Sequence, residues 1–223
     1  MYDSKTAVQA LLCFGLCASG INSALAEYEP NDNYSTFVVS YQTAKFTKPV
    51  CIAGGECHDF IAGPAIFYAK QAIPNLALGM AGSQLQASGK LSSIKSSTVS
   101  AFLEYIAGLG SMADVGASVA VLSATTDLCT SLPNTCASVN DNGSNVGVFG
   151  KVFLADKRTV SLTLSYNSIY YQQSPNQSVI GLTLFAILAK KHRVAFTVDR
   201  VRDASGNDIS GGLGLSYSYL LNY

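Results

Sequence analysis

The chain has 223 residues with 14 basic and 14 acidic side chains, so its formal net charge is zero. This balance argues against a nucleic-acid partner, because such partners select a basic face. Only 13% of the residues are charged and the mean hydropathy is +0.26, yet no stretch offers the ~20 apolar residues of a membrane-spanning helix.

The N-terminal segment predicts export. Residues 7–18 form an apolar run that is too short to span a bilayer, and Ala24-Leu25-Ala26 follows with small residues at the cleavage positions. Residues 1–26 are therefore expected to be a cleaved signal peptide. Residues 27–223 remain as a single all-β domain.

Strand-like segments succeed one another in this domain, and short and long connections alternate between them. About ten strands are expected, with eight as the alternative, because an even number returns the chain to its starting side in a closed antiparallel barrel. The expected strands are 36–44, 60–70, 76–85, 98–106, 114–123, 145–154, 159–170, 179–188, 193–201 and 209–223. The expected long connections are 45–59, 86–97, 124–144, 171–178 and 202–208.

Three of these strands have one apolar face and one face of small or polar residues. Successive side chains of a strand point to opposite faces, so the apolar face can meet lipid while the other faces the lumen. The side chains expected to face lipid are Leu162, Leu164, Tyr166, Val194, Phe196, Val198, Leu213, Leu215, Tyr217, Tyr219, Leu221 and Tyr223.

The C-terminal segment 213–223 alternates Leu and Tyr with Gly, Ser and Asn, and it ends on Tyr223. It resembles the closing strand of bacterial outer-membrane β-barrels, which serves as an assembly signal. The resemblance implies an integral protein of the outer membrane of a Gram-negative bacterium. It also implies periplasmic chain ends, contact with the barrel-assembly machinery through this strand, and outward-facing long connections.

A soluble β-sandwich or lipocalin-like barrel is the alternative fold. Its strands would also alternate, but their outer face should be polar and charged. Here the polar face consists mostly of Ser, Thr, Gly and Ala, which suits a narrow interior better than a solvated exterior.

Four cysteines remain after the predicted cleavage. Cys51 and Cys57 lie in the first long connection, and Cys129 and Cys136 lie in the third. In an oxidising compartment two local disulfides are expected, although four cysteines allow three pairings. A metal site built from Cys51, Cys57 and His58 is a weaker alternative, because the spacing matches no structural zinc pattern. No metal or cofactor is therefore expected.

The chain has only two histidines, His58 and His192, that could serve as a catalytic base. His58 lies beside the first cysteine pair, and His192 is expected in a periplasmic turn. Neither belongs to a His-x-Ser or Asp-x-His pattern of known outer-membrane hydrolases. The expectation is that the protein is not an enzyme, with a hydrolase as the alternative.

Four charged residues fall on faces expected to point into the lumen: Glu104, Lys151, Arg193 and Asp199. They predict either a narrow channel for ions or small solutes or a structural network within a filled interior. Phe102, Phe149 and Phe153 fall on the same faces and favour the filled interior, because small barrels hold side chains rather than water.

The first two long connections carry basic residues that could meet lipopolysaccharide phosphates as point charges or simply be solvated: Lys45, Lys48, Lys90 and Lys95. The expected protein is thus a monomeric barrel in contact with outer-membrane lipid and lipopolysaccharide. Its expected role is structural, or interaction with lipopolysaccharide, host or phage through disulfide-braced outer loops. A porin-like channel is the alternative.

Overall fold

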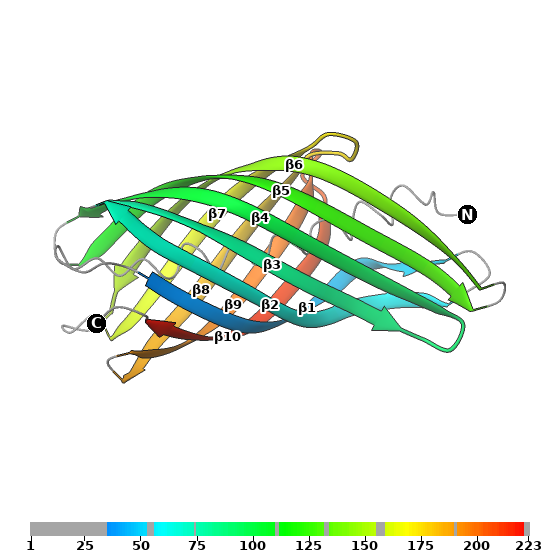
Figure 1. The fold of residues 1–223 in the computed structure, drawn as a ribbon, viewed down its shortest axis with the longest axis horizontal. Coiled ribbons are helices and arrows are strands. Elements are labelled where there is room, and N and C mark those ends of the chain that lie inside the picture. The colour runs from blue at the N-terminus through cyan, green and yellow to red at the C-terminus, as the bar shows by residue number, and fades with distance from the viewer. Residues whose placement is uncertain are drawn as a thin grey trace.

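Ten antiparallel strands close into one barrel in the computed structural model (Figure 1). The structure describes residues 35–52, 56–73, 75–109, 112–131, 134–154, 159–189 and 191–220, so the expected signal peptide, Leu221 and Tyr223 lie outside the described residues. The strands are β1 (Ser35–Cys51), β2 (Cys57–Ile73), β3 (Leu76–Ser88), β4 (Ser92–Leu109), β5 (Ala113–Ser131), β6 (Asn134–Phe153), β7 (Val160–Tyr171), β8 (Gln177–Ala189), β9 (His192–Asp203) and β10 (Asp208–Leu220).

The barrel closes where the first strand meets the last. β1 pairs with β10 from Thr36 opposite Leu220 to Phe46 opposite Ser210, and every other strand pairs with its neighbours in the sequence. The prediction of a closed antiparallel barrel with about ten strands is confirmed. No helix in the described part of the chain is long and apolar enough to cross a membrane.

The two ends of the barrel differ. At the terminal end, β1 begins and β10 ends (Figure 1). At the opposite end, which we call the hairpin end, β1–β2, β3–β4, β5–β6, β7–β8 and β9–β10 are connected. The wall is uneven, because β5 and β6 have 19 and 20 residues whereas β7 to β10 have 12 or 13.

Three of the expected long connections are wrong. Most of 45–59, 86–97 and 124–144 continues the strands β1 to β6. The segments 86–97 and 124–144 are rich in Ser, Thr, Asn and Lys, and 45–59 contains Pro49 and two glycines, which indicated loops. A hairpin ladder requires only backbone pairing, however, so it can extend beyond the point where the apolar alternation ends.

Side chains fill the barrel in two apolar clusters separated by polar residues. One cluster includes Val38, Phe67 and Phe102, and the Phe67 and Phe102 rings stack with centroids 5.0 Å apart. The second cluster lies farther along the same strands and includes Phe46 and Ile61. On β1 the two clusters are separated by the buried polar residues Ser40 and Gln42. Because apolar side chains fill the interior at both clusters, little room remains around the charged side chains of the lumen.

Two glycines make room for the largest inward side chains. Gly79 on β3 lies opposite Phe102 on β4, and Gly116 on β5 lies opposite Phe149 on β6. A Cβ atom at either glycine would collide with the ring of its partner and with a backbone carbonyl. The interior is therefore filled by pairing a large residue with a residue that has no side chain.

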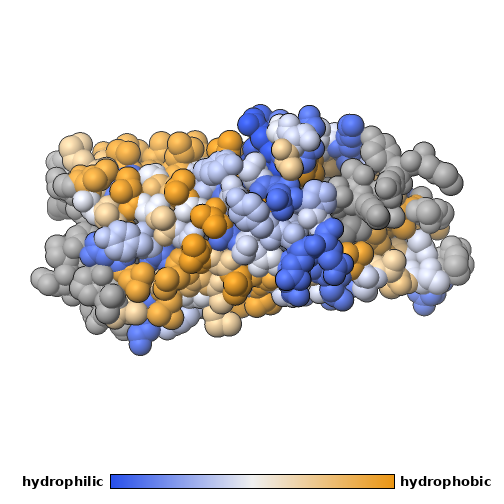
Figure 2. Space-filling view, turned by 90° about the horizontal axis from the view of Figure 1, so that it is seen from above, coloured by the Kyte–Doolittle hydropathy of each residue, from blue (hydrophilic) through white to orange (hydrophobic). Residues whose placement is uncertain are grey.

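Apolar side chains on the outer surface form rows across neighbouring strands. Leu164, Leu182, Val198 and Leu213 are register partners on β7 to β10, and all four are exposed. Figure 2 shows apolar residues gathered over the left half of one face, with hydrophilic residues more frequent toward the right. An apolar surface of this extent is unfavourable in water and marks contact with another apolar phase.

If this outer face lies in hydrocarbon, Leu164→Arg should lower the free energy of unfolding in lipid vesicles by about 2–4 kcal/mol, the cost of an arginine near the bilayer midplane. Thr47→Arg is the matched control, because Thr47 is exposed on β1 beyond Lys45. It should change stability little. Because the chain has no Trp, urea unfolding can be followed by the mobility of the folded form on unheated gels. Equal effects of both substitutions would contradict the lipid-facing assignment.

Candidate interaction surface at the hairpin end

Both predicted disulfides are present. Cys51 bonds to Cys57 and Cys129 bonds to Cys136, with Cα–Cα distances of 4.0 and 4.1 Å. Each pair is also a pair of register partners, on β1–β2 and on β5–β6. The disulfides thus cross-link paired strands rather than brace irregular loops. Since the sulfurs of Cys51 and Cys57 are bonded to each other, they do not form the thiolate metal site considered as an alternative.

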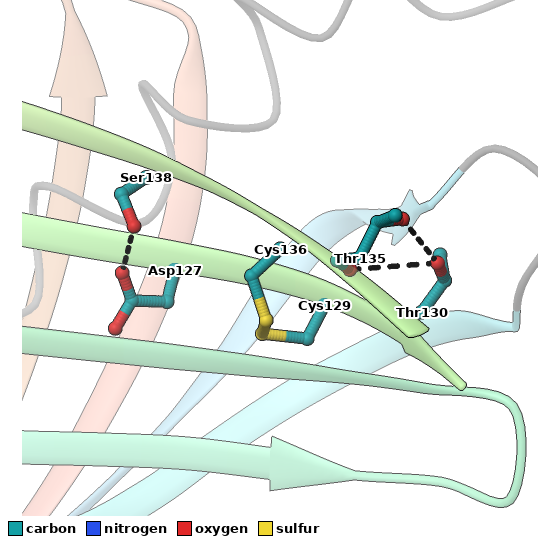
Figure 3. The surroundings of a disulfide bond; sticks show 6 residues. All are labelled: Asp127, Cys129, Thr130, Thr135, Cys136 and Ser138. Atoms are coloured by element: carbon teal, nitrogen blue, oxygen red, sulfur yellow. Dashed lines mark hydrogen bonds between the residues drawn. A yellow bond between two sulfur atoms is a disulfide. The ribbon is translucent and has the colours of Figure 1, made fainter. Parts of the chain in front are cut away.

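The β5–β6 hairpin is held by polar contacts on both sides of its disulfide (Figure 3). Toward the tip, the Thr130 hydroxyl lies 3.1 Å from that of Thr135. Toward the barrel, the Ser138 hydroxyl donates a hydrogen bond to the Asp127 carboxylate. Together with the disulfide, these contacts fix the strand pairing of a segment whose side chains are mostly exposed.

His58 lies at the same end, buried on β2. Its Nε2 is 3.0 Å from the Ser92 hydroxyl oxygen, which also accepts a hydrogen bond from the Glu56 backbone N–H. The Glu56 carboxylate accepts a hydrogen bond from the Leu91 backbone N–H. These contacts join the β1–β2 hairpin to the β3–β4 hairpin. Sequence reasoning missed Ser92, because 34 residues separate it from His58.

His192 occupies the terminal end and is the first residue of β9 rather than part of a turn. Its Nδ1 forms a hydrogen bond with the Tyr217 hydroxyl, and its ring meets the Tyr219 ring edge-on with centroids 5.4 Å apart. His58 and His192 therefore lie at opposite ends of the barrel. They do not form a common site.

The four charges expected in the lumen are buried, with exposed fractions of 3% for Glu104, 2% for Lys151, 4% for Arg193 and 8% for Asp199. Two further buried carboxylates, Asp114 and Asp141, were missed. Asp114 stands at the edge of an expected strand, and Asp141 fell in an expected loop. Asp114 is the register partner of Lys151.

Lys151 is the centre of the charges at the terminal end. It interacts electrostatically with Glu104, and its Nζ lies 4.8 Å from the centre of the Phe153 ring and 5.8 Å from that of Phe185. Asp199 is six positions beyond Arg193 on β9, so it lies closer to the hairpin end. The structure thus brings together Glu104, Asp114 and Lys151, with Arg193 near the same end.

Basic residues are exposed on the outer surface toward the hairpin end. Lys45 on β1 and Arg200 on β9 are both register partners of Gly211 on β10. Gly211 has no side chain, so the space between the two cations is open on the outside. Arg200 forms an ion pair with Asp208 at 3.3 Å and still has 60% of its side chain exposed. Sequence reasoning missed Arg200. Lys48, Lys90 and Lys95 are also exposed toward this end.

Asp203 organises the β9–β10 connection. Its carboxylate accepts hydrogen bonds from the backbone N–H groups of Ser205 and Asn207 and from the Asn207 side-chain amide. Slight burial disfavours the charged form, but these hydrogen bonds hold the pKa of Asp203 below its usual value of 3.8. The turn at the hairpin end is therefore closed by a charged carboxylate.

No protein-family model and no curated protein matches this chain. Among solved structures, it is similar to the translocator domain of the autotransporter NalP from Neisseria meningitidis, at 12% identity and a TM-score of 0.58, with 97% of each chain covered. It is also similar to Ail, the attachment invasion locus protein of Yersinia pestis, at 8% identity and a TM-score of 0.44, with 84% of this chain and 98% of that chain covered. A third similar structure is the outer membrane protein OprG from Pseudomonas aeruginosa, at 12% identity and a TM-score of 0.43, with 86% of this chain and 100% of that chain covered.

At these identities the similarity concerns the fold alone. The fold is that of bacterial outer-membrane β-barrels. The solved structures therefore confirm the resemblance to bacterial outer-membrane β-barrels that the C-terminal segment of the sequence indicated.

The disulfides predict a local effect on stability. Cys129→Ser combined with Cys136→Ser should destabilise the tip of the β5–β6 hairpin, residues 127–138, by about 2.5 kcal/mol, the chain entropy of so short a loop. Amide hydrogen exchange near Val139 should accelerate, while exchange in β7 to β10 should not. Peptide mapping without reduction should recover Cys51 linked to Cys57 and Cys129 linked to Cys136. Any other pairing would contradict the structure.

Proposed function

We propose that this protein is a small outer-membrane barrel that acts through its hairpin end, where disulfide-linked strands present a surface to the outside. The proposal rests on the contrast between the lumen of the barrel and the β5–β6 hairpin. The lumen is packed at two levels by apolar side chains, whereas β5 and β6 extend past the shorter strands β7 to β10 with exposed side chains. The exposed side chains at the hairpin end are accessible to a partner, whereas the packed lumen is not.

The proposal includes an orientation and an assembly route. The terminal end would face the periplasm, and the hairpin end would face outward. β10 would be the strand that the barrel-assembly machinery recognises, because it carries the alternating Leu and Tyr residues and completes the barrel by pairing with β1. Within its own membrane the protein would be a monomer. The filled interior and the separation of His58 from His192 support a role that is not enzymatic.

Lipopolysaccharide is the proposed ligand of the outer wall at the hairpin end. Lys45 and Arg200 flank the open position at Gly211, and the next outward row toward the terminal end contains the exposed apolar residues Leu213 and Val198. A lipid with phosphate groups above acyl chains matches cations placed directly above an apolar wall. Arginine suits this role, because its planar guanidinium can contact a phosphate through two donors.

Lipopolysaccharide is therefore the probe for the first test. Lys45→Gln combined with Arg200→Gln should weaken binding of lipopolysaccharide to the detergent-solubilised protein about tenfold and reduce its salt dependence, because two phosphate contacts are lost. Lys70→Gln is the control, since Lys70 is exposed near the terminal end. Isothermal titration can measure the affinities. Unchanged binding in the double variant would refute this ligand assignment.

A narrow channel is the second candidate function, and the buried charges around Lys151 favour it. Planar-bilayer recording distinguishes the two functions. A filled interior predicts no reproducible unitary conductance for the wild-type protein or for Lys151→Glu. Unitary steps whose ion selectivity changes with Lys151→Glu would instead establish the channel and overturn the filled interior.

A further inference from the structure

The projecting part of β6 has a partner strand on one side only. Residues 134–142 pair with β5, whereas pairing with β7 begins at Gly143. Within the described part of the chain, no strand pairs with the other side of residues 134–140. The segment after β7 reaches only the barrel-side limit of this edge in the described part of the chain. There the Gln172 N–H bonds to the Asn142 carbonyl, and the backbone N–H groups of Gln173 and Ser174 bond to the Asp141 carboxylate.

Register parity determines which backbone groups this edge presents. The Asn142 carbonyl and the Leu154 N–H both bond on the β7 side, and the Phe153 N–H bonds on the β5 side. The β5–β6 register is uninterrupted, so even-numbered residues of β6 direct their N–H and C=O groups away from β5. The disulfide agrees, because the 4.1 Å Cα–Cα distance between Cys129 and Cys136 belongs to a pair without mutual backbone hydrogen bonds. The edge groups are those of Asn134, Cys136, Ser138 and Asn140.

This edge lacks the features that usually protect an exposed strand. Such edges commonly carry Lys, Pro or a bulge, because unpaired backbone groups recruit other strands. The segment 134–140 contains no charged residue and no Pro, and its register shows no bulge. The disulfide between Cys129 and Cys136 holds it in strand form (Figure 3). The edge is therefore preformed to accept a further strand.

We propose that this edge binds the same edge of a second copy of the protein. The edge is self-complementary in the antiparallel sense when Ala137 lies opposite Ala137 of the second copy. Asn134 then faces Asn140 and Cys136 faces Ser138, and each of these pairs consists of residues whose N–H and C=O groups point outward. The central pair is alanine, which fits the close approach of a pair without mutual hydrogen bonds.

Geometry places the two copies in facing membranes. Two antiparallel edges are related by a twofold axis perpendicular to the local sheet. That axis is perpendicular to the barrel axis, so it points the two barrels in opposite directions. Copies in one membrane all point the same way, whereas copies in two opposed membranes meet hairpin end to hairpin end. A single contact is weak, because its hydrogen bonds replace bonds to water, but many contacts between two membranes act together.

This inference rests on the proposed outward surface and names a partner for it. The test uses two populations of lipid vesicles, labelled with donor and acceptor dyes, that carry the full-length protein. Random insertion leaves part of the hairpins facing outward in each population. Energy transfer between the populations should rise only when both carry the protein. Bare acceptor vesicles should give the background value.

Two pairs of variants make the test specific. Ser138→Pro removes one outward N–H without breaking a β5 hydrogen bond, and it should reduce vesicle tethering about tenfold, because many contacts weaken together. Ser138→Ala, which loses only the hydroxyl contact with Asp127, should tether as the wild type does. Ala137→Lys, which places like charges opposite each other, should also reduce tethering at least about tenfold, whereas Ala137→Ser should leave it unchanged. Heat-modifiable gel mobility checks that each variant is folded.

The inference is overturned if the wild-type protein does not tether vesicles. It is also overturned if Ser138→Pro and Ala137→Lys both tether normally while folded, or if wild-type vesicles bind bare ones equally well. Lipopolysaccharide binding in detergent, measured on the same preparations, reports on the proposed function independently. If lipopolysaccharide binding is retained but vesicles are not tethered, the pairing with a second copy is refuted and the proposed lipopolysaccharide binding stands.

Discussion

The pairing of β1 with β10 is the constraint on which the remaining structure depends. In hydrocarbon no water can satisfy backbone N–H and C=O groups, so a sheet survives there only if its two edges meet. The ladder from Thr36–Leu220 to Phe46–Ser210 removes both edges of the wall. Once the ring is closed, strand alternation assigns each side chain to the lumen or to the outside.

Closure around ten strands also sets what the interior can hold. Large inward residues such as Phe102 and Phe149 fit because glycines lie opposite them on the neighbouring strands. Charges are accepted where opposite signs meet, as around Lys151, because a buried charge without a partner is costly. The lumen therefore serves the stability of the wall, and the accessible chemistry shifts to the hairpin end.

The accessible surface at the hairpin end results from the unequal lengths of the strands. Beyond the end of β7, β5 stays paired with β4, with Thr130 opposite Ser92, and β6 becomes an edge strand. A disulfide and side-chain hydrogen bonds strengthen the β5–β6 pairing there, at Cys129–Cys136, Thr130–Thr135 and Asp127–Ser138. The same extension creates the one long stretch of β6, within the described residues, that β7 does not cover. A barrel with strands of equal length would have no such edge.

Local patterns in the sequence determined the fold class, the strand number and the disulfide pairing, because alternation and short cysteine spacing act between neighbouring residues. The ends of β1 to β6 were missed, since a ladder can continue through polar residues without leaving an apolar pattern. Only the tertiary structure decided which distant residues are neighbours. It places Asp114 opposite Lys151 and His58 against Ser92, and it puts Lys45 and Arg200 on the two sides of Gly211. These contacts depend on the register between strands, which the whole ring determines when it closes.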